Sequence, residues 1–379
     1  MRKIAILALA TVLAIGSASQ AFSNAVADSQ PAIAAQLSPF AARPQQKLAT
    51  SLIEAGAEDG SLDVSAALPH AEAALDNDLL ATEALAVMAL AQDDPAARNT
   101  LVDAALAVSR RGRVLNSAAL VAATANGDTD TLLAALNRSL LLYPSQKEAM
   151  IPLLVEQLAD DRMAPAFIPL LDTNPDWAEE FWVAVGAREE LAQNAATVRL
   201  GLAPESAVSR ESDRAILRLL SRTGRLQEAA QVYARLRGEQ QLPAQTGSLG
   251  WQNTYVPFDW QFYDVGGRFA RPASDGESLT ISVRAGYGGV LARRLVRLDG
   301  STSFFEVTHS LDPASTSRVR LTLECPDSDA RWSDTFSRSP TGMRVDVPMP
   351  CEYAWLGIEA RATAGSQNIS GQILDIKRM

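Results

Sequence analysis

The sequence predicts a two-part fold, in which a helical-repeat region of the α-solenoid type is followed by an antiparallel β-sandwich. Three observations support this prediction. Apolar residues recur at helical spacing as far as Gly238, a polar segment covers residues 239–248, and beyond it apolar and polar residues alternate with a period of two. We therefore expect a helical domain over residues 40–238, a linker over 239–248 and a sandwich over 249–379.

The composition fits a multidomain globular protein with an acidic helical part. A chain of 379 residues allows two or three domains, and its 47% hydrophobic content is ample for a core. Residues 244–379 contain 14 Lys or Arg against 15 Asp or Glu, whereas the rest of the chain contains 20 against 29. The net charge of −10 argues against nucleic acid as a partner, because binding to phosphates needs an excess of cations.

The N-terminal residues 1–27 have the pattern of a secretory signal peptide. Arg2 and Lys3 precede the apolar run Ile4–Gly16, and small residues follow it. The run is shorter than the about 20 residues that cross a bilayer. A buried helix and a retained membrane anchor are the alternatives to an exported chain without a stable membrane span. We expect a periplasmic or secreted protein.

Two positions in this segment have the small residues that cleavage requires. One follows Ala21 and the other follows Ala27, so the mature chain is expected to begin near Phe22 or Asp28. The sequence leaves both sites open.

Helix start and stop signals punctuate residues 40–238. Asp94–Pro95 offers an N-cap followed by a proline in the first turn, and Asn126–Gly127 is a typical helix end. Ser145–Glu148 has the spacing of a capping box, and Asn174–Pro175 opens a further helix. These signals predict a series of short, alanine-rich helices.

The best-defined helical pair spans Glu211–Gly238. Two apolar stripes with helical spacing flank a break at Arg222–Gly224. Two short helices joined by such a turn form an antiparallel hairpin, and a hairpin of this kind needs similar neighbours to bury both of its faces.

The second half of this pair resembles a tetratricopeptide repeat. The motif G-x-x-x-E-A-x-x-x-Y runs from Gly224 to Tyr233, and a degenerate copy covers Gly127–Pro144. Leu132 and Leu217 depart from the family pattern, which has a small residue at these positions. The resemblance implies that the helical repeats hold a protein partner in their concave face.

The period of two after residue 248 predicts short strands separated by glycine-containing turns. Such strands over about 130 residues indicate a sandwich or barrel. The inward-facing residues expected for four of them are Leu279, Ile281 and Val283; Phe305, Val307, His309 and Leu311; Val319, Leu321, Leu323 and Cys325; and Met343, Val345 and Val347.

The order of landmarks in this part resembles the galactose-binding-like jelly rolls, which include many carbohydrate-binding modules. The resemblance implies a jelly-roll sandwich with a possible polysaccharide ligand. Together, the two parts look like exported repeat proteins that accompany bacterial surface-polysaccharide production. The landmarks are Pro257–Trp260, Gly276–Ile281, Gly289–Gly300, Phe304–Phe305, Trp332, Phe336 and Ile373–Ile376.

No motif of known catalytic or metal-binding chemistry is present, so we expect no catalytic residues, no metal site and no cofactor. The two histidines, His70 and His309, lie in different predicted domains, and His309 has the alternation of a packed strand residue. A glycosidase would need two carboxylates across a cleft. Asp259, Asp264 and Asp275 are loop residues that keep this alternative open.

Aromatic residues are the more informative group, because sugar rings stack on exposed aromatic faces. For Trp251, Tyr255 and Trp332 the sequence leaves a surface platform and core packing equally open, whereas Trp260 and Trp355 are expected in the sandwich core. Trp177 and Trp182 are expected in the helical core. The candidate glycan-binding residues are Trp251, Tyr255, Trp332, Asn253, Gln261 and Asp264.

Cys325 and Cys351 are the two cysteines of the chain. Both fall in the predicted sandwich, and an exported protein meets an oxidising compartment. We therefore expect them to form a disulfide.

These inferences predict an exported, non-catalytic binding or scaffold protein of the bacterial cell envelope. Its helical repeats would bind a protein partner, and its sandwich would contact a glycan. One alternative is a glycan-modifying envelope enzyme with two convergent carboxylates. The other is a purely structural assembly protein whose sandwich binds no sugar.

Overall fold

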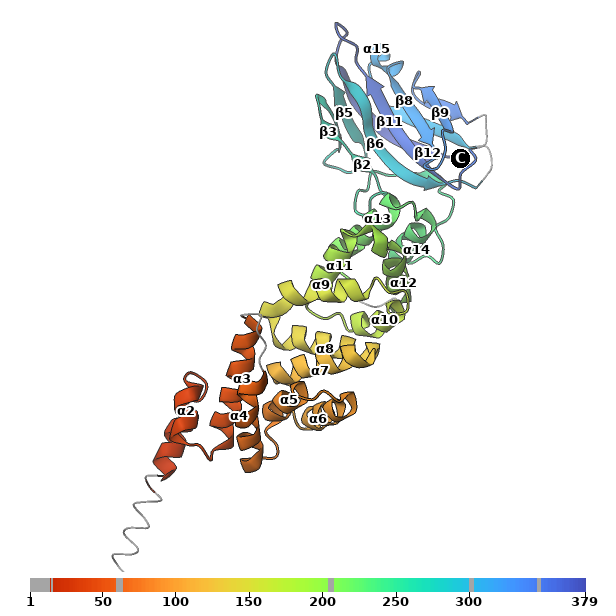
Figure 1. Cartoon of the computed structure of the whole chain (residues 1–379). Helices are drawn as coiled ribbons and strands as arrows, with labels where there is room; N and C mark the ends of the chain where they lie inside the picture. The colour runs from red at the N-terminus through yellow and green to blue at the C-terminus, as the bar shows by residue number, and fades with distance from the viewer. Residues whose placement is uncertain (1–13, 15, 59–63, 204–207, 300–302, 346–348) are drawn as a thin grey trace, which may run out of the picture. The chain divides into compact units, whose positions relative to one another are not determined.

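A computed structural model describes residues 14, 16–58, 64–203, 208–299, 303–345 and 349–379. The predicted fold class is confirmed: paired helices are followed by two antiparallel sheets packed as a β-sandwich (Figure 1). The chain divides into two compact units, Met1–Leu154 and Val155–Met379, which we describe separately. Among the described residues, no helix has both the length and the apolarity needed to cross a membrane.

The first unit consists of helices that pack as successive antiparallel neighbours. Helices α3, α5 and α7 also contact one another, so that alternate helices form a common layer. The helices are α2 (Pro31–Leu37), α3 (Ala42–Glu58), α4 (Val64–Asn77), α5 (Thr82–Leu90), α6 (Pro95–Val108), α7 (Arg113–Asn126) and α8 (Thr129–Leu142), and α9 (Lys147–Gln157) crosses the unit boundary.

Local sequence signals fix some of the helix ends in this unit. The Asp94 carboxylate accepts hydrogen bonds from the backbone N–H groups of Ala96 and Ala97, and Gly127 ends α7 in the left-handed conformation with φ of 65°. Both predicted signals are confirmed. The helix predicted to open after Ser145 is present as α9, which follows a 3₁₀ turn over Pro144–Gln146, and the capping box itself stays a prediction.

The second unit begins with short helices around a cluster of aromatic rings. The ring centroids of Phe167 and Phe181 lie 5.4 Å apart, and Trp177 and Trp182 both meet the Phe181 ring edge-on. Trp177 and Trp182 are fully buried, as predicted. The helices of this unit are α10 (Ala164–Asp172), α11 (Ala178–Gly186), α12 (Ala192–Gly201), α13 (Arg210–Arg222) and α14 (Leu226–Leu236), with a 3₁₀ turn over Glu189–Leu191.

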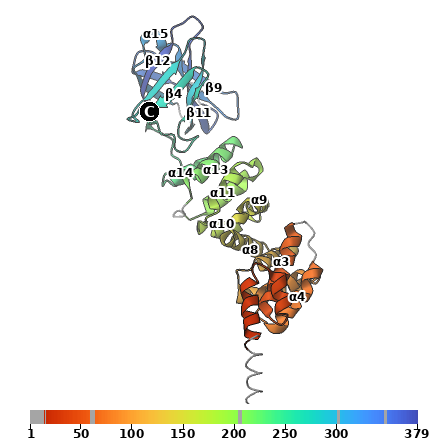
Figure 2. The ribbon, with the colours of Figure 1, turned by 90° about the vertical axis from the view of Figure 1, so that its left-hand side faces the viewer.

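The predicted hairpin over Glu211–Gly238 is the pair α13 and α14. Gly224 makes the turn with φ of 74°, a conformation that favours glycine. A buried ion pair ties α13 to α12, since the Arg199 guanidinium lies 2.7 Å from the Asp213 carboxylate. Figures 1 and 2 both show this hairpin beside one end of the sandwich.

The sandwich consists of two antiparallel sheets. One has the strand order β10-β7-β12-β5-β4-β3, with β1 paired to β12, and the other has the order β2-β6-β11-β8-β9. The strands are β1 (Gly247–Ser248), β2 (Gln261–Phe262), β3 (Asp264–Val265), β4 (Arg268–Pro272), β5 (Leu279–Val283), β6 (Gly288–Arg297), β7 (Phe304–His309), β8 (Val319–Glu324), β9 (Arg331–Thr335), β10 (Thr341–Arg344), β11 (Tyr353–Arg361) and β12 (Ile369–Arg378), and a short helix, α15 (Pro313–Thr316), precedes β8.

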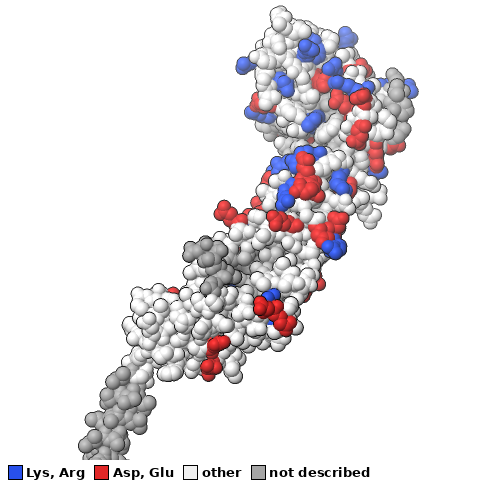
Figure 3. Space-filling view, viewed as in Figure 1, with Lys and Arg blue, Asp and Glu red and all other residues white. Residues whose placement is uncertain are grey.

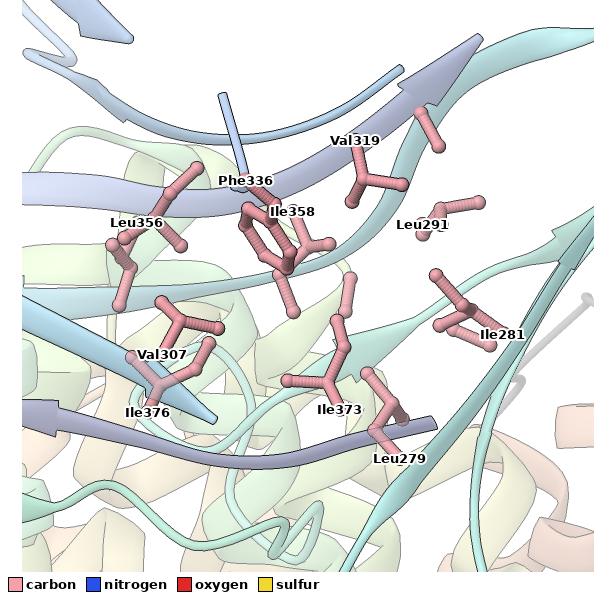
Figure 4. Close-up of a cluster of buried hydrophobic side chains, with 14 of the residues drawn as sticks. Leu279, Ile281, Leu291, Val307, Val319, Phe336, Leu356, Ile358, Ile373 and Ile376 are labelled. Atoms are coloured by element: carbon pink, nitrogen blue, oxygen red, sulfur yellow. The ribbon is translucent and has the colours of Figure 1, made fainter. Parts of the chain in front are cut away.

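The period-two alternation puts one face of each sheet into a common core. Leu356 and Ile358 of β11 point toward Ile373 and Ile376 of β12, and the ring of Phe336 lies between the layers (Figure 4). The predicted strands at Leu279, Phe305, Val319 and Met343 are all present, and their alternating residues are buried. The predicted position Val347 lies outside the described residues.

The polar segment before the sandwich is part of the folded structure. Gly247 and Ser248 pair with Arg378 and Lys377 of β12. The carbonyl oxygen of Leu242, a residue that is 5% exposed, accepts a hydrogen bond from Arg297. The segment over 239–248 therefore runs along the sandwich rather than standing free.

The predicted disulfide is confirmed. Cys325 and Cys351 are bonded, with their Cα atoms 5.8 Å apart. The bridge joins the residue after β8 to the segment before β11, and the loop that it closes contains strands of both sheets.

Removing this bridge should destabilise the second unit. A loop closed over a sequence separation of 26 is expected to contribute about 3 kcal/mol by restricting the unfolded chain. We expect the variant with both Cys325→Ala and Cys351→Ala to lose about this much in the free energy of unfolding by urea. All six tryptophans of the chain lie in the second unit, so tryptophan fluorescence reports on it selectively.

Dithiothreitol provides the control for this measurement. Reductant should lower the stability of the wild-type protein to that of the double variant and leave the variant itself unchanged. An equal response of both proteins to reductant would contradict the stabilising role of the bridge.

Candidate functional site

The second unit contains a cavity of about 640 Å³ beside the hairpin end of the sandwich. Three parts of the chain form its walls: the end of α14, the segment over 239–252 and the neighbouring strands and loops of the sandwich. The residues that line it are Tyr233, Arg237, Glu239, Leu242, Pro243, Ala244, Gln245, Thr246, Ser248, Leu249, Gly250, Trp251, Gln252, Asp259, Gly276, Glu277, Arg294, Leu374 and Asp375.

A buried hydrogen bond between Tyr233 and Asp259 forms one wall of the cavity. The Tyr233 hydroxyl donates to Asp259 Oδ1 at 2.8 Å, and its ring stacks on Phe258 with a centroid separation of 5.0 Å. The backbone N–H of Tyr255 donates to Asp259 Oδ2 at 2.7 Å. Both carboxylate oxygens of Asp259 are therefore engaged, and α14 is fixed to the loop that precedes β2.

Burial keeps the Tyr233 phenol in this wall protonated. Burial first, and then the charge of Asp259, raise the pKa of the Tyr233 phenol well above its ordinary value. The phenol therefore remains a hydrogen-bond donor at every physiological pH.

Arg294 brings a buried cation to the cavity. It lies on the inward side of β6 and is only 5% exposed. Its Nη1 donates to the carbonyl oxygen of Leu249 at 2.7 Å, and its guanidinium carbon lies 5.6 Å from the ring centroid of Trp260. Burial lowers the pKa of Arg294, an effect that the nearby Tyr233 and Asp259 oppose.

Two buried polar atoms of the cavity residues have no hydrogen-bond partner among the described residues. One is the donor Nε of Arg294, and the other is the acceptor Oε1 of Gln245. Leaving a buried donor or acceptor unpaired typically costs about 1–3 kcal/mol. Both atoms belong to residues that line the cavity, but both are themselves buried, so a ligand in the cavity reaches them only after a shift of the lining side chains.

Charged and hydroxyl groups complete the lining. Ser248 donates its hydroxyl to Asp375 at 2.6 Å. Arg237 and Arg294 are the cations of the lining, and the four carboxylates are those of Glu239, Asp259, Glu277 and Asp375. Acidic groups outnumber basic ones, so the cavity disfavours a polyanion.

Of the six predicted glycan-binding residues, only Trp251 lines this cavity. It is 6% exposed, its ring lies 5.2 Å from that of Trp260, and it belongs to the sandwich core. The packing alternative therefore applies to Trp251, which contributes part of a cavity wall rather than an exposed platform.

The other five predicted residues lie outside the cavity. The Tyr255 ring packs edge-on against Tyr233, and the half-buried Trp332 stacks on Phe305. The remaining three are polar: Gln261 Oε1 accepts a hydrogen bond from Arg293 Nε, Asp264 pairs with Arg271, and Asn253 is exposed.

The expectation that Trp260 and Trp355 both fill the core is correct for one of them. Trp260 is fully buried in the core, but Trp355 is half-buried and lies on the opposite face of its sheet. Ala354 and Leu356 take the inward positions of β11, so Trp355 points outward, where the Arg293 guanidinium lies 4.3 Å from its ring centroid.

The carboxylates considered for a glycosidase each have a local role. Asp259 holds Tyr233, Asp264 pairs with Arg271, and Asp275 accepts a hydrogen bond from the backbone N–H of Glu277. In the described part of the chain, no group of three or more His, Cys, Asp or Glu residues is arranged to hold a metal ion.

His309 is packed within the sandwich, as its alternation indicated. It is 6% exposed and stacks on Phe336, and burial lowers its pKa. Its Nε2 lies 3.1 Å from the carbonyl oxygen of Ser337.

Sequence reasoning missed Arg294 and Gln245. A signal for Arg294 was present in the sequence. The residues two positions before and after it, Ala292 and Val296, are core residues, so Arg294 occupies an inward position. A charged residue at an inward position of a strand requires a specific partner. No comparable signal marks Gln245, which lies in a polar segment.

Comparisons with known proteins add no assignment: no family model matches the chain, and the search of curated proteins finds no match.

Replacing Tyr233 by phenylalanine should destabilise the second unit. The change removes the phenolic donor and leaves a buried oxygen of Asp259 without this partner, at a cost of about 1–3 kcal/mol. Urea unfolding followed by tryptophan fluorescence at pH 7 should detect the loss. Tyr287→Phe is the matched control, because Tyr287 is 48% exposed and its replacement should have little effect.

The difference between wild type and Tyr233→Phe should shrink at alkaline pH. The pKa of Tyr233 is raised in the folded state, so its contribution is complete below the unfolded value of about 10 and is lost as the pH rises above it. A difference that stays constant well above pH 10 would contradict the assigned hydrogen bond.

Proposed function

We propose that the protein is a non-catalytic binding protein of the cell envelope whose second unit holds a neutral saccharide in the cavity beside Trp251. The unpaired Arg294 Nε and Gln245 Oε1 carry this proposal. A sugar hydroxyl both donates and accepts hydrogen bonds, so the hydroxyls of a saccharide match both atoms once the lining side chains shift to admit them.

The dimensions and chemistry of the cavity support the same ligand class. Its volume of about 640 Å³ lies in the usual range of ligand sites. The Trp251 indole provides an apolar wall, and the excess of carboxylates favours a neutral polyhydroxylated ligand over an anionic one. The order of landmarks in the sequence, which resembles that of carbohydrate-binding modules, agrees with this proposal.

Gln245→Leu tests the proposal. Losing one neutral hydrogen bond of roughly 1 kcal/mol should weaken binding of a glycan-array hit by about five- to tenfold in calorimetry. The stability of the free protein should remain the same or rise, because the change removes an unpaired buried acceptor. Reduced affinity without reduced stability would identify Gln245 as a ligand-binding residue.

Gln261→Leu is the matched control. Gln261 is one of the loop and strand residues outside the cavity, and its side-chain oxygen already accepts a hydrogen bond from Arg293. Binding should be unaffected by this change. If Gln261→Leu weakens binding and Gln245→Leu does not, the ligand binds outside the cavity, near the predicted aromatic residues Tyr255 and Trp332. A complete absence of glycan binding would favour the structural assembly alternative, and release of reducing ends would favour an enzyme.

We further propose that the helical repeats bind a protein partner, as the resemblance to tetratricopeptide repeats implies, and that the interface lies on the first unit, which contains the degenerate copy over Gly127–Pro144. Large apolar side chains are exposed at the turns of this unit, with Phe40 85% exposed, Leu79 81% and Leu80 63%. Phe40 precedes α3 and Leu79 follows α4, so both lie at the same end of this antiparallel helix pair. Exposed apolar clusters commonly mark protein interfaces.

The face of the first unit seen in Figure 3 has few charged side chains, whereas both signs are interspersed over the visible face of the sandwich. A face with few charges is better suited to a protein partner than to a polyanion. This contrast supports separate roles for the two units, with a protein partner for the first and a saccharide for the second.

Exchanging the exposed apolar residues for serine should abolish partner capture. We expect Phe40→Ser combined with Leu79→Ser to lose a partner that wild-type protein retains in cross-linked envelope extracts, with unchanged helicity by circular dichroism. Val121→Ser, at another exposed apolar position of the unit, is the control and should retain the partner. Equal capture by all three proteins would place the interface elsewhere.

A further inference from the structure

The residues that follow the apolar N-terminal run are part of the folded first unit. Residues 16–26 are helical, and a turn begins at residue 27. Ser23 is fully buried, and its hydroxyl donates to the carbonyl oxygen of Ala34 in α2 at 2.7 Å. Ala27 is also fully buried. This segment therefore covers one side of α2.

The two cleavage sites that the sequence leaves open differ sharply in how exposed their residues are. Ala21 is exposed and Phe22 is 57% exposed, whereas Ala27 has no exposed surface. Cleavage after Ala21 keeps Ser23 and Ala27 in the mature chain. Cleavage after Ala27 removes both, and with them the hydrogen bond from the Ser23 hydroxyl to the carbonyl oxygen of Ala34 in α2.

Charge gives a second distinction between the sites. The Asp28 carboxylate lies 2.8 Å from both the Arg43 guanidinium and the Lys47 ammonium. A chain that began at Asp28 would place a new ammonium group beside these two cations. Like charges in such proximity repel one another. An ammonium at Phe22 avoids this arrangement.

We propose that export of this protein ends with hydrolysis of the peptide bond between Ala21 and Phe22, so that residues 22–27 form the first packed segment of the mature protein. A signal-peptidase-type protease would add water across this bond, which releases the Ala21 carboxylate and the Phe22 ammonium. Ser19 and Ala21 provide the small residues before the cut. This inference rests on export of the chain and is independent of saccharide binding.

Mass spectrometry of the exported protein tests the proposal. The full chain, expressed in a Gram-negative host with a C-terminal tag, should be recovered from the periplasm with Phe22 as its first residue. Recovery of a chain that begins at Asp28, or of one that retains Met1, would overturn the proposal. Intact mass and N-terminal sequencing distinguish the three outcomes.

Two substitutions sharpen this test. Ala21→Leu places a bulky residue before the proposed cut and should cause the precursor to accumulate. Ala25→Leu alters the alternative site at a position that is exposed in the fold, and it should leave the Phe22 terminus unchanged. Inhibition by Ala25→Leu but not by Ala21→Leu would reverse the assignment.

A stability measurement tests the packing argument itself. Mature chains beginning at Phe22 and at Asp28 should differ in the melting of the helical signal, with the shorter chain melting at lower temperature. Equal melting temperatures would show that residues 22–27 do not belong to the fold and would remove the basis of the proposal.

Discussion

The hydrogen bond between Tyr233 and Asp259 is the constraint on which the arrangement of the second unit depends. It joins a helix to the loop that begins the sandwich, and both of its partners are buried. An unpaired carboxylate at this position would be costly, so the phenol and the carboxylate hold one another in place. The neighbouring stack of Tyr233 on Phe258 adds apolar contact to the same junction. The same junction lines the cavity together with the end of α14 and Arg294 of β6.

Much of the fold could be predicted because local patterns determine it. Asp94 and Gly127 act through their own backbone neighbourhood, so their roles follow from a few residues of sequence. The disulfide was predictable for another reason, since two cysteines in one oxidised domain leave a single pairing. The helix predicted after Ser145 is also present as α9, and a 3₁₀ turn, common at helix N-termini, precedes it.

The site could not be predicted, because it depends on contacts between distant segments. Tyr233 matches a repeat motif that places an aromatic between helices, yet here its ring lies against Phe258 of the sandwich. The two faces of β11 also mislead, because bulky Trp355 faces outward while Ala354 faces the core. From side-chain size alone, Trp355 would be expected to face the core and Ala354 to face outward. The choice of face follows from strand pairing and sheet packing, which a single sequence does not contain.

The position of β12 has a consequence for the order of folding. This strand is the last of the sandwich in chain order, yet it lies between β7 and β5 in its sheet and also pairs with β1. The sheet therefore cannot close while the ribosome is still adding residues 369–378. Pairings between segments so far apart in the chain form slowly, because a long loop must be ordered first. Until β12 arrives, β5 and β7 present open edges, and unpaired strand edges are prone to pair with other chains.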